Sequence, residues 1–300
     1  MEKQLKLQRY MAKIHLEGVT LCDKTVAMTG STGGIGRELC RYLLSLGARL
    51  ILIDRNPSRA ESLRQLLIGE YPHAELILMK ADLSDMTSVR EVTERLIQLS
   101  PDIFIHNAGA YSIPRKICDT GYDNVYQINF VSPYYMIREL LPSLKEHHGR
   151  VVVVGSIAHN YSKTDPESID FANRKQASKV YGNAKRYLMF SMYELFSGET
   201  DVSVSVTHPG ITFTGITAHY PKLIFALIKY PMKMIFMKPR KACLSILKGV
   251  FDPCDKCEWI GPRFFGVWGL PKKSRLKTVS PEEQRFIGQT AQNTYRRLTK

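Results

Sequence analysis

The feature that most constrains the fold is an apolar segment that leads directly into a glycine-rich turn. TVAMT (25–29) is followed by TGSTGGIG (29–36), and a helical pattern then extends over 35–46 and ends at Gly47. Glycines between a strand and a helix let the backbone approach a pyrophosphate, which binds where the free N–H groups of the helix N-terminus point. This segment predicts the start of a dinucleotide-binding α/β unit.

Further apolar runs recur along the chain, with helical patterns between most of them. They are RLILI (49–53), ELILM (75–79), DIFIH (102–106), VVVVG (151–155) and VSVSV (202–206). Continuous apolar strands that alternate with helices predict a parallel sheet covered on both faces. The expected fold is a single α/β domain, a doubly wound parallel sheet of the Rossmann type over 24–270. An N-terminal extension (1–23) and a basic tail (271–300) flank it, and the last twenty residues predict a peripheral helix.

The net charge of +14 is concentrated near the C-terminus. From Thr217 onward there are 17 Lys and Arg against five Asp and Glu. Residues 217–241 are apolar and basic with no acid, which predicts a short helical insert that forms a lid over a substrate pocket. This insert could also contact an anionic membrane surface, or it could be a solvated basic face. No nucleic-acid recognition motif accompanies the charge, so nucleic acid is not an expected partner.

Composition and cysteine usage favour a cytoplasmic globular protein. The chain is 44% hydrophobic and 23% charged, and it has neither a run of about 18 uncharged apolar residues nor an apolar leader segment. Six scattered cysteines are typical of reduced thiols. Cys254 and Cys257 form a single C-x-x-C, but a zinc site needs four ligands and no second pair is near. Loop cysteines and no metal are therefore expected.

An acid ends the second predicted strand, in ILIDRN. The carboxylate of Asp54 can accept both ribose hydroxyls of NAD, and it repels the 2′-phosphate of NADP. Arg55 favours the opposite choice, since a guanidinium can pair with that phosphate. The sequence predicts NAD in preference to NADP, and both residues could alternatively be ordinary turn residues.

YGNAK (181–185) places a lysine four residues after a tyrosine. Alone, such a pair could be surface neighbours on a helix. Hydride transfer to a carbonyl needs a proton donor at the oxygen, and a nearby lysine, aided by a positive nicotinamide ring, would lower the tyrosine pKa from its usual value near 10. Ser156, at the end of the fifth strand, would hydrogen-bond the developing alkoxide.

Taken in order, these motifs resemble the short-chain dehydrogenase/reductase superfamily from about Lys24 to Gly210. The motifs are TGSTGGIG, Asp82–Leu83, HNAG (106–109), Asn129 in YQIN, Ser156, YGNAK and HPG (208–210). GSIAH (155–159), the 25-residue step from Ser156 to Tyr181, and KPRKA are similar to the retinol dehydrogenase and WW-domain oxidoreductase branch. Asp54 departs from that branch, whose NADP-dependent members usually carry a small residue there.

The resemblance implies a catalytic set of Asn129, Ser156, Tyr181 and Lys185, in which Asn129 would anchor a water between Lys185 and solvent. It also implies a cofactor-binding set, namely Gly30, Ser31, Thr32, Gly34, Ile35, Gly36, Asp54, Arg55, Asp82, Leu83, Asn107, Ala108, Gly109, Tyr181, Lys185, Pro209 and Gly210. His159 and His208 are more readily explained as packed residues than as catalytic ones.

The branch's substrates are retinoids, steroids and other lipophilic alcohols or carbonyls. The leading hypothesis is an NAD(P)-dependent oxidoreductase of a lipophilic secondary alcohol or ketone, such as a hydroxysteroid. The alternatives are a retinol- or aldehyde-type dehydrogenase and a non-catalytic dinucleotide-binding sensor or scaffold. The apolar pocket is expected around 111–117, 157–170 and 211–237. The superfamily also often forms homo-oligomers through its long helices.

Overall fold

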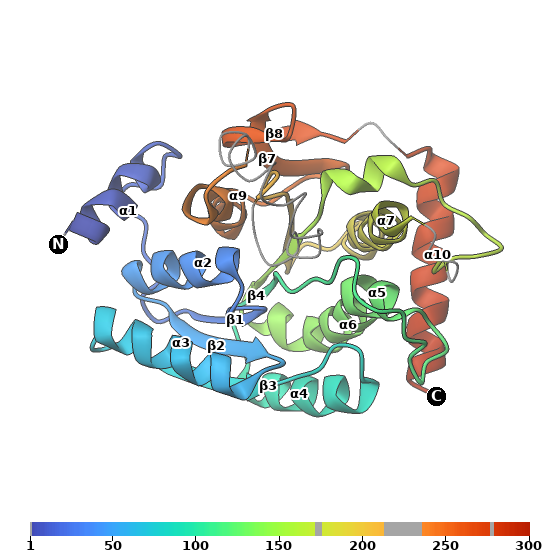
Figure 1. The fold of residues 1–300 in the computed structure, drawn as a ribbon, viewed down its shortest axis with the longest axis horizontal. Helices are drawn as coiled ribbons and strands as arrows, with labels where there is room; N and C mark the ends of the chain where they lie inside the picture. The colour runs from blue at the N-terminus through green and yellow to red at the C-terminus, as the bar shows by residue number, and fades with distance from the viewer. Residues whose placement is uncertain (1, 172–175, 213–235, 277–278) are drawn as a thin grey trace, which may run out of the picture.

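The computed structural model describes residues 2–171, 176–212, 236–276 and 279–300, and is built on one eight-stranded sheet (Figure 1). The strand order is β3-β2-β1-β4-β5-β6-β7-β8. The strands are β1 (Thr25–Thr29), β2 (Arg49–Asp54), β3 (Leu76–Lys80), β4 (Ile103–His106), β5 (Arg150–Val154), β6 (Ser203–Thr207), β7 (Glu258–Phe264) and β8 (Trp268–Arg275). Neighbouring strands are parallel except for β8, which is antiparallel to β7.

Helices cover both faces of this sheet, which confirms the predicted doubly wound α/β fold. They are α1 (Glu2–Ala12), α2 (Gly34–Ser45), α3 (Pro57–Glu70), α4 (Met86–Leu99), α5 (Asn124–Tyr126), α6 (Ser132–Glu146), α7 (Ala177–Leu195), α9 (Pro239–Phe251) and α10 (Pro281–Leu298), with a π-helical turn η1 (Gln127–Val131) and a 3₁₀ turn η2 (Ile157–Tyr161). Alternate residues of each strand face opposite sides. In β5, Val151 and Val153 join the core under α4, α6 and α7, whereas Val152 and Val154 join the core under α2 and α9.

The helix N-termini differ in a way that matters for the site. Asn56 caps α3 by accepting the Arg59 N–H, and Asp85 caps α4 by accepting the Thr87 N–H. By contrast, α2 starts after Gly33, which provides no side-chain cap. The first N–H groups of a helix have no intrahelical acceptor. The N-terminus of α2 therefore presents donors that an external anion can accept.

The C-terminal region differs from the sequence expectation. The boundary expected at 270 falls inside β8, which pairs along β7. The sequence analysis predicted neither strand, and each contains a proline, Pro262 and Pro271, which argues locally against a strand interior. β7 tolerates Pro262 because its ladder with β6 is confined to the pair Thr207–Ile260, and β8 tolerates Pro271 because it is an edge strand.

The polar composition of the last helix predicted a peripheral position, but the structure shows that this helix packs onto the domain. α10 packs against α7, and the side chains of Ile287, Ala291 and Leu298 belong to the core under that face. A polar helix can bury a narrow apolar stripe, and this stripe is what a summed composition hides. At the other boundary, residues 239–241 of the expected lid open α9, and 217–235 lie outside the described residues.

The N-terminal extension also packs onto the domain. Leu7 and Met11 of α1, together with Ile14, Leu16 and Leu21, are buried in the core shared with α2 and α9. Within the part of the chain that the structure describes, no helix is long and apolar enough to cross a membrane.

Candidate active site

The glycine turn after β1 is shaped by close backbone contacts. A Cβ on Gly30, whose φ is +73°, would lie 2.8 Å from Ala108 Cα, and a Cβ on Gly36 would lie 2.3 Å from the Gly30 carbonyl oxygen. Only glycine fits at these two positions without backbone movement. Gly33, Gly34 and the partly exposed Ile35 line the outer side of the turn at the uncapped end of α2.

The carboxylate of Asp54 is bound by the same turn. Oδ1 accepts the Thr32 N–H (3.1 Å) and the Thr32 hydroxyl (2.8 Å), and Oδ2 accepts the Ser31 hydroxyl. Ser31 is fully buried and Asp54 is 5% exposed, whereas the next residue, Arg55, is exposed. The sequence suggested a carboxylate directed at a ribose, and the structure adds that this carboxylate ties β2 to the glycine turn.

The ends of β3 and β4 complete this side of the site. Asp82 Oδ1 accepts the N–H (2.9 Å) and hydroxyl (2.7 Å) of Ser84, which forms a turn after β3 next to the buried Leu83. Asn107 donates to the Gly30 carbonyl oxygen (2.8 Å) and thereby joins the HNAG motif to the glycine turn. Gly30 and Ala108 are in direct backbone contact, so the two loops form one surface.

Asn129 lies in the π-helical turn η1, between α5 and α6. Its amide donates to the carbonyl oxygens of Val125 and Ala110 (both 2.8 Å), and its Oδ1 accepts the Ala110 N–H (3.3 Å). The bond to Val125, four residues earlier, competes with the helical ladder and accompanies the π-turn. A Cβ on Gly109 would lie 2.9 Å from Asn129 Oδ1 and 3.6 Å from Lys185 Nζ, so these three residues meet.

Ser156, Tyr181 and Lys185 converge at the end of β5. A hydrogen bond links Ser156 and Tyr181, while Lys185 Nζ donates to the Val154 carbonyl oxygen (2.8 Å) and lies 5.8 Å from the Tyr181 ring centroid. Desolvation raises the pKa of Tyr181 to about 12, and the Ser156 hydrogen bond opposes this rise. Burial also lowers the pKa of Lys185 to about 7. In the protein alone, the Tyr181 pKa is therefore shifted away from neutrality, opposite to the direction expected for the working enzyme.

These residues fit a nicotinamide dinucleotide. The uncapped N-terminus of α2 offers backbone donors for a pyrophosphate, and the exposed Gly33 and Gly34 leave that surface free of side chains. Asp54 and Arg55 stand at the end of β2, where an adenosine ribose would bind. Gly109 lies against Lys185, close to Tyr181, and these three residues would hold the nicotinamide end of the dinucleotide.

A buried hydrogen-bond network, which the sequence did not reveal, holds the backbone of Ser156. His159 Nδ1 lies 2.6 Å from the Ser156 carbonyl oxygen, so this nitrogen carries the proton and donates. Desolvation, opposed by this hydrogen bond, lowers the pKa of His159 to about 4, and the ring is neutral at pH 7. Arg186 Nη1 donates to the His159 carbonyl oxygen (3.0 Å), and its Nε donates to Glu283 of α10 (2.7 Å).

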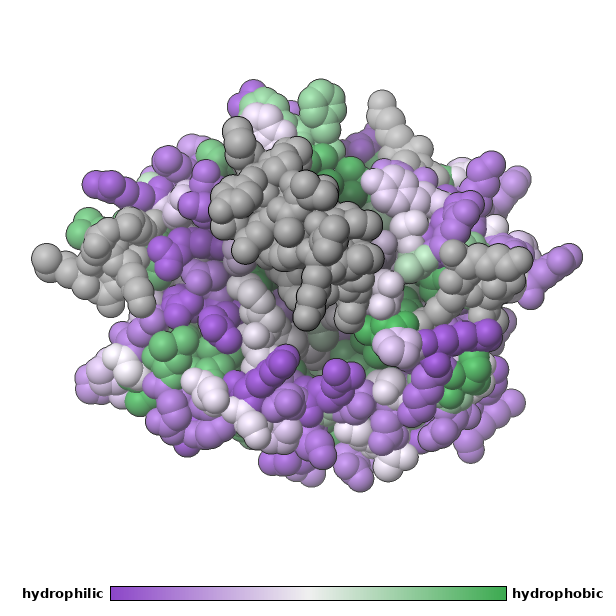
Figure 2. Space-filling model, in the orientation of Figure 1, coloured by the Kyte–Doolittle hydropathy of each residue, from purple (hydrophilic) through white to green (hydrophobic). Residues whose placement is uncertain are grey.

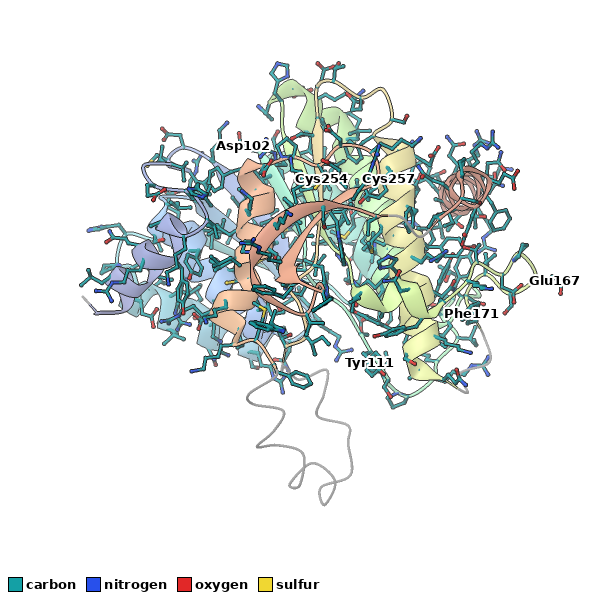
Figure 3. The ribbon with its side chains drawn as sticks, turned by 90° about the horizontal axis from the view of Figure 1, so that it is seen from above. Asp102, Tyr111, Glu167, Phe171, Cys254 and Cys257 are labelled. Atoms are coloured by element: carbon teal, nitrogen blue, oxygen red, sulfur yellow. The ribbon has the colours of Figure 1, made fainter. Side chains whose placement is uncertain are left out.

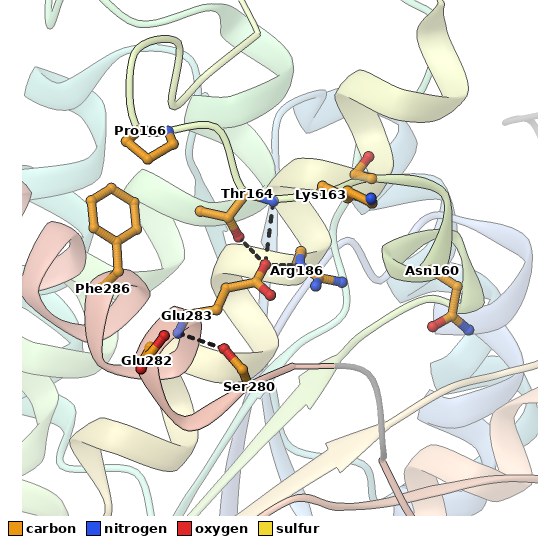
Figure 4. Close-up of a pocket in the computed structure, with 10 residues that line it drawn as sticks. Asn160, Lys163, Thr164, Pro166, Arg186, Ser280, Glu282, Glu283 and Phe286 are labelled. Atoms are coloured by element: carbon orange, nitrogen blue, oxygen red, sulfur yellow. Dashed lines mark hydrogen bonds and ion pairs between the residues drawn. The ribbon is translucent and has the colours of Figure 1, made fainter.

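Glu283 also binds the loop after η2, through the N–H (3.2 Å) and hydroxyl of Thr164 (Figure 4). This contact lies at an open pocket of about 720 Å³. Its lining residues are Asn160, Ser162, Lys163, Thr164, Pro166, Arg186, Ser280, Glu282, Glu283 and Phe286. Ser156 and Tyr181 do not line this pocket, so it is separate from the reacting groups.

The remaining predicted residues have mainly packing contacts. Pro209 is buried, and a Cβ on Gly210 (φ +80°) would lie 2.6 Å from the Val267 carbonyl oxygen, so Gly210 accommodates the β7–β8 hairpin. His208 stacks on Trp259, with ring centroids 5.1 Å apart. Cys254 and Cys257, both labelled in Figure 3, lie just before β7, and their sulfur atoms bond separate partners, the Val206 carbonyl oxygen and Gln284.

The comparison with known families agrees with this geometry. The model of the short chain dehydrogenase family matches residues 24–222. The chain belongs to this family. A dehydrogenase/reductase SDR family member, FEY, from Arabidopsis thaliana is 31% identical over 269 residues, which cover 83% of this chain and 71% of that protein. Retinol dehydrogenase 14 from Mus musculus is 31% identical over 261 residues, with coverage of 81% and 77%. The chain is thus an oxidoreductase-family member similar to the retinol dehydrogenase-like branch.

Solved structures share the fold. An uncharacterized protein from Mycobacterium paratuberculosis superposes with a TM-score of 0.71 at 20% identity, over 94% of this chain and 95% of that one. A short-chain dehydrogenase from Sphingobium yanoikuyae in complex with NADPH gives a TM-score of 0.60 at 21% identity, over 75% and 83%.

Proposed function

We propose that this protein transfers a hydride between a nicotinamide dinucleotide and a lipophilic secondary alcohol or ketone, such as a hydroxysteroid. The observation that carries the proposal is the convergence of Ser156, Tyr181 and Lys185 beside the glycine turn, within one family domain. A proton donor, a hydrogen-bond donor and a lysine at one strand end are what reduction of a carbonyl needs.

In this proposal Tyr181 donates its hydroxyl proton to the carbonyl oxygen during reduction and takes that proton back during oxidation. The Ser156 hydroxyl orients the same oxygen. When bound, the dinucleotide supplies the hydride or accepts it, and its oxidised ring brings a positive charge. Lys185, with a pKa near 7, holds a proton at the inner end of the path that Asn129 would connect to solvent through a water.

For the cofactor, we propose NAD in preference to NADP. Asp54 sits at the end of β2 with its oxygens held by Ser31 and Thr32, and a fixed negative charge there disfavours a 2′-phosphate. Wild-type kcat/KM should be higher with NAD. Asp54→Asn, which removes the charge and keeps the shape, should lower the ratio of NAD to NADP efficiency about tenfold, equal to about 1.4 kcal/mol.

Arg55→Ala is the matched control for this test. It should lower efficiency with NADP and leave that with NAD nearly unchanged, because the exposed guanidinium pairs only with the extra phosphate. A wild-type preference for NADP that Asp54→Asn does not alter would contradict the proposed cofactor choice.

For the substrate, the support comes from the apolar character of the described residues near Tyr181 and from the retinol dehydrogenase relatives. The Tyr111 ring packs edge-on against Tyr181 (centroids 5.3 Å apart) and lies beside α7 in Figure 3, and Ile157 follows Ser156 directly. A panel of steroid, bile-acid and retinoid alcohols and carbonyls, with NAD and NADP and absorbance at 340 nm, tests the proposal. Turnover of the secondary alcohols or ketones supports it.

Preference for retinoid primary alcohols or aldehydes would instead favour the second candidate, which rests on retinol dehydrogenase 14 as a relative. Binding of the dinucleotide, seen as quenched nicotinamide fluorescence, without turnover of any compound would favour a sensor or scaffold. The expected lid and membrane contact at 217–241 fall largely outside the described residues and stay predictions. Assembly through the long helices is also a prediction.

A further inference from the structure

The hairpin of β7 and β8 ends in a cluster of exposed apolar side chains. We call Phe264, Phe265, Trp268 and Leu270 the aromatic tip. Phe265 is 89% exposed and lies at the turn, where φ is +52°, and the rings of Phe264 and Trp268 pair with centroids 4.7 Å apart. Hydrophobic residues, in green, project at the top of Figure 2, where Figure 1 labels β8. Such a patch is costly in water and marks an interaction surface.

The backbone under the aromatic tip is held in place. The Val267 N–H donates to the Phe264 carbonyl oxygen (2.9 Å), and the Val267 carbonyl oxygen accepts the Ile211 N–H (3.2 Å). Gly210 fits against this turn because it has no Cβ. The tip therefore projects from a turn that is anchored to the segment after β6, at the same ends of the strands as Ser156.

The charges around the tip have one sign. Residues 259–281 contain five Lys and Arg and no Asp or Glu. Arg263, Lys272 and Arg275 are exposed, whereas Lys273 pairs with Asp252 (2.6 Å) outside this segment. On one face of β8 the exposed residues run from Trp268 and Leu270 to Lys272, so the apolar end is followed by cations.

We propose that this hairpin docks the protein onto the surface of an anionic phospholipid bilayer. Trp and Phe side chains favour the headgroup region, where the ring is partly desolvated. Arg263, next to Phe264, and Lys272, two residues after Leu270 on the same face of β8, then lie closest to the lipid phosphates and are attracted by an anionic leaflet. The surface is built from residues 263–272 of the hairpin, and the positive charge next to the aromatic tip favours an anionic bilayer as its occupant.

The proposal does not rest on the proposed hydride transfer, because docking is measured without turnover. The test is flotation of the full chain with phosphatidylcholine vesicles and with vesicles containing 30% phosphatidylserine, at about 0.1 M salt. The wild type should float with the anionic vesicles, and Phe265→Ser/Trp268→Ser should reduce the bound fraction at least tenfold. The matched control is Ile77→Ser on β3, the opposite edge strand, where Ile77 is 42% exposed.

The charged residues are tested in the same assay. Arg263→Glu/Lys272→Glu should weaken binding to anionic vesicles and remove most of its salt dependence, whereas Lys80→Glu on β3 should not. Fluorescence locates the contact directly, because the chain has two tryptophans. With Trp259→Phe, the emission of Trp268 alone should shift to the blue on binding, and lipids brominated in the upper acyl chain should quench it.

Three results would overturn the proposal. The first is a wild type that does not float with either vesicle. The second is full binding by Phe265→Ser/Trp268→Ser, which would assign membrane contact to another segment such as 217–241. The third is a dimer in analytical ultracentrifugation that dissociates in the tip variants, together with unchanged flotation, which would make the tip an interface between copies of the chain.

Discussion

The glycine turn and helix α7 lie together at the carboxyl ends of the central strands, but their polar groups are in opposite environments. In the turn, Asp54 is bound by Ser31 and Thr32, and polar groups satisfy one another. On α7, Tyr181 and Lys185 are desolvated, and their pKa values are shifted to about 12 and about 7. A preorganised binding surface thus lies beside two ionisable groups whose pKa values differ from their ordinary values. Perturbed groups of this kind mark the reacting part of a site.

The largest effect on stability should come from the turn, where the backbone leaves no room for a side chain. In Gly36→Ala the new Cβ would lie 2.3 Å from the Gly30 carbonyl oxygen and 2.9 Å from Ser31 Cα. We expect a loss of about 3 kcal/mol in the free energy of unfolding, with cofactor affinity falling at least tenfold. Urea denaturation and fluorescence titration measure the two quantities.

Gly33→Ala is the control, because its Cβ would meet only the Gly30 carbonyl oxygen, at 3.5 Å. It should leave the free energy of unfolding nearly unchanged. Equal losses of stability in the two variants would mean that the close contacts at Gly36 do not shape the turn.

Helix α7 should behave in the opposite way to the turn, because a substitution at Lys185 should lower activity and raise stability. Burial lowers the folded-state pKa of Lys185 to about 7, so between about pH 7 and the unfolded value near 10.5 the unfolded chain binds more protons. The contribution of Lys185 to the free energy of unfolding is therefore least unfavourable near pH 10 and becomes more unfavourable as the pH falls to 7. Lys185→Met should raise the free energy of unfolding by about 2 kcal/mol at pH 7, and this gain should shrink toward pH 10.

Lys179→Met, on the exposed side of the same helix, should show no such pH-dependent gain. Activity should fall in Lys185→Met and persist in Lys179→Met. A Lys185→Met variant that is less stable than the wild type at pH 7 would contradict the destabilising burial of this lysine.

The sequence predicted the first six strands and the α/β fold, and the resemblance grouped Asn129, Ser156, Tyr181 and Lys185, because local motifs mark these positions along the chain. The structure places Ser156, Tyr181 and Lys185 together, and their roles stay predictions. The sequence could not predict contacts that join distant segments. Asp54 belongs to β2 but bonds Ser31 and Thr32 after β1, and no local pattern encodes that choice of partner.

The network behind Ser156 and the hairpin were missed for the same reason. Arg186 pairs with a glutamate 97 positions away, and His159 provides a ring nitrogen to a backbone carbonyl, which the sequence leaves unspecified. The prolines of β7 and β8 argue against strands locally, and only the sheet edge makes them acceptable. The acid pair Glu282–Glu283 at the start of α10 is the one signal that could have suggested a buried cationic partner.

The smallest of these effects concerns that network, which positions Ser156 without touching substrate. Glu283→Ala removes the acceptor of the Arg186 Nε–H and of Thr164, which should loosen His159 and lower kcat about tenfold with little change in KM. Glu283→Gln keeps an acceptor oxygen and should restore most of the turnover. Glu282→Ala, at the neighbouring position of the same pocket, should behave as wild type.

A purely structural role for Glu283 would appear differently. Stability would fall in Glu283→Ala while kcat per folded molecule stayed at the wild-type level. Thermal unfolding recorded on the same samples separates this outcome from a loss of positioning.

The most direct test of the two-part site is Tyr181→Phe, with turnover and dinucleotide affinity measured on one sample. The ring and its edge contact with Tyr111 remain, and only the hydroxyl that hydrogen-bonds Ser156 is lost. We expect kcat to fall about 10³-fold or more while the dissociation constant of the dinucleotide changes less than threefold. Turnover at the wild-type rate would contradict the assignment of Tyr181 as the proton donor, and a loss of dinucleotide binding would contradict the separation of the two regions.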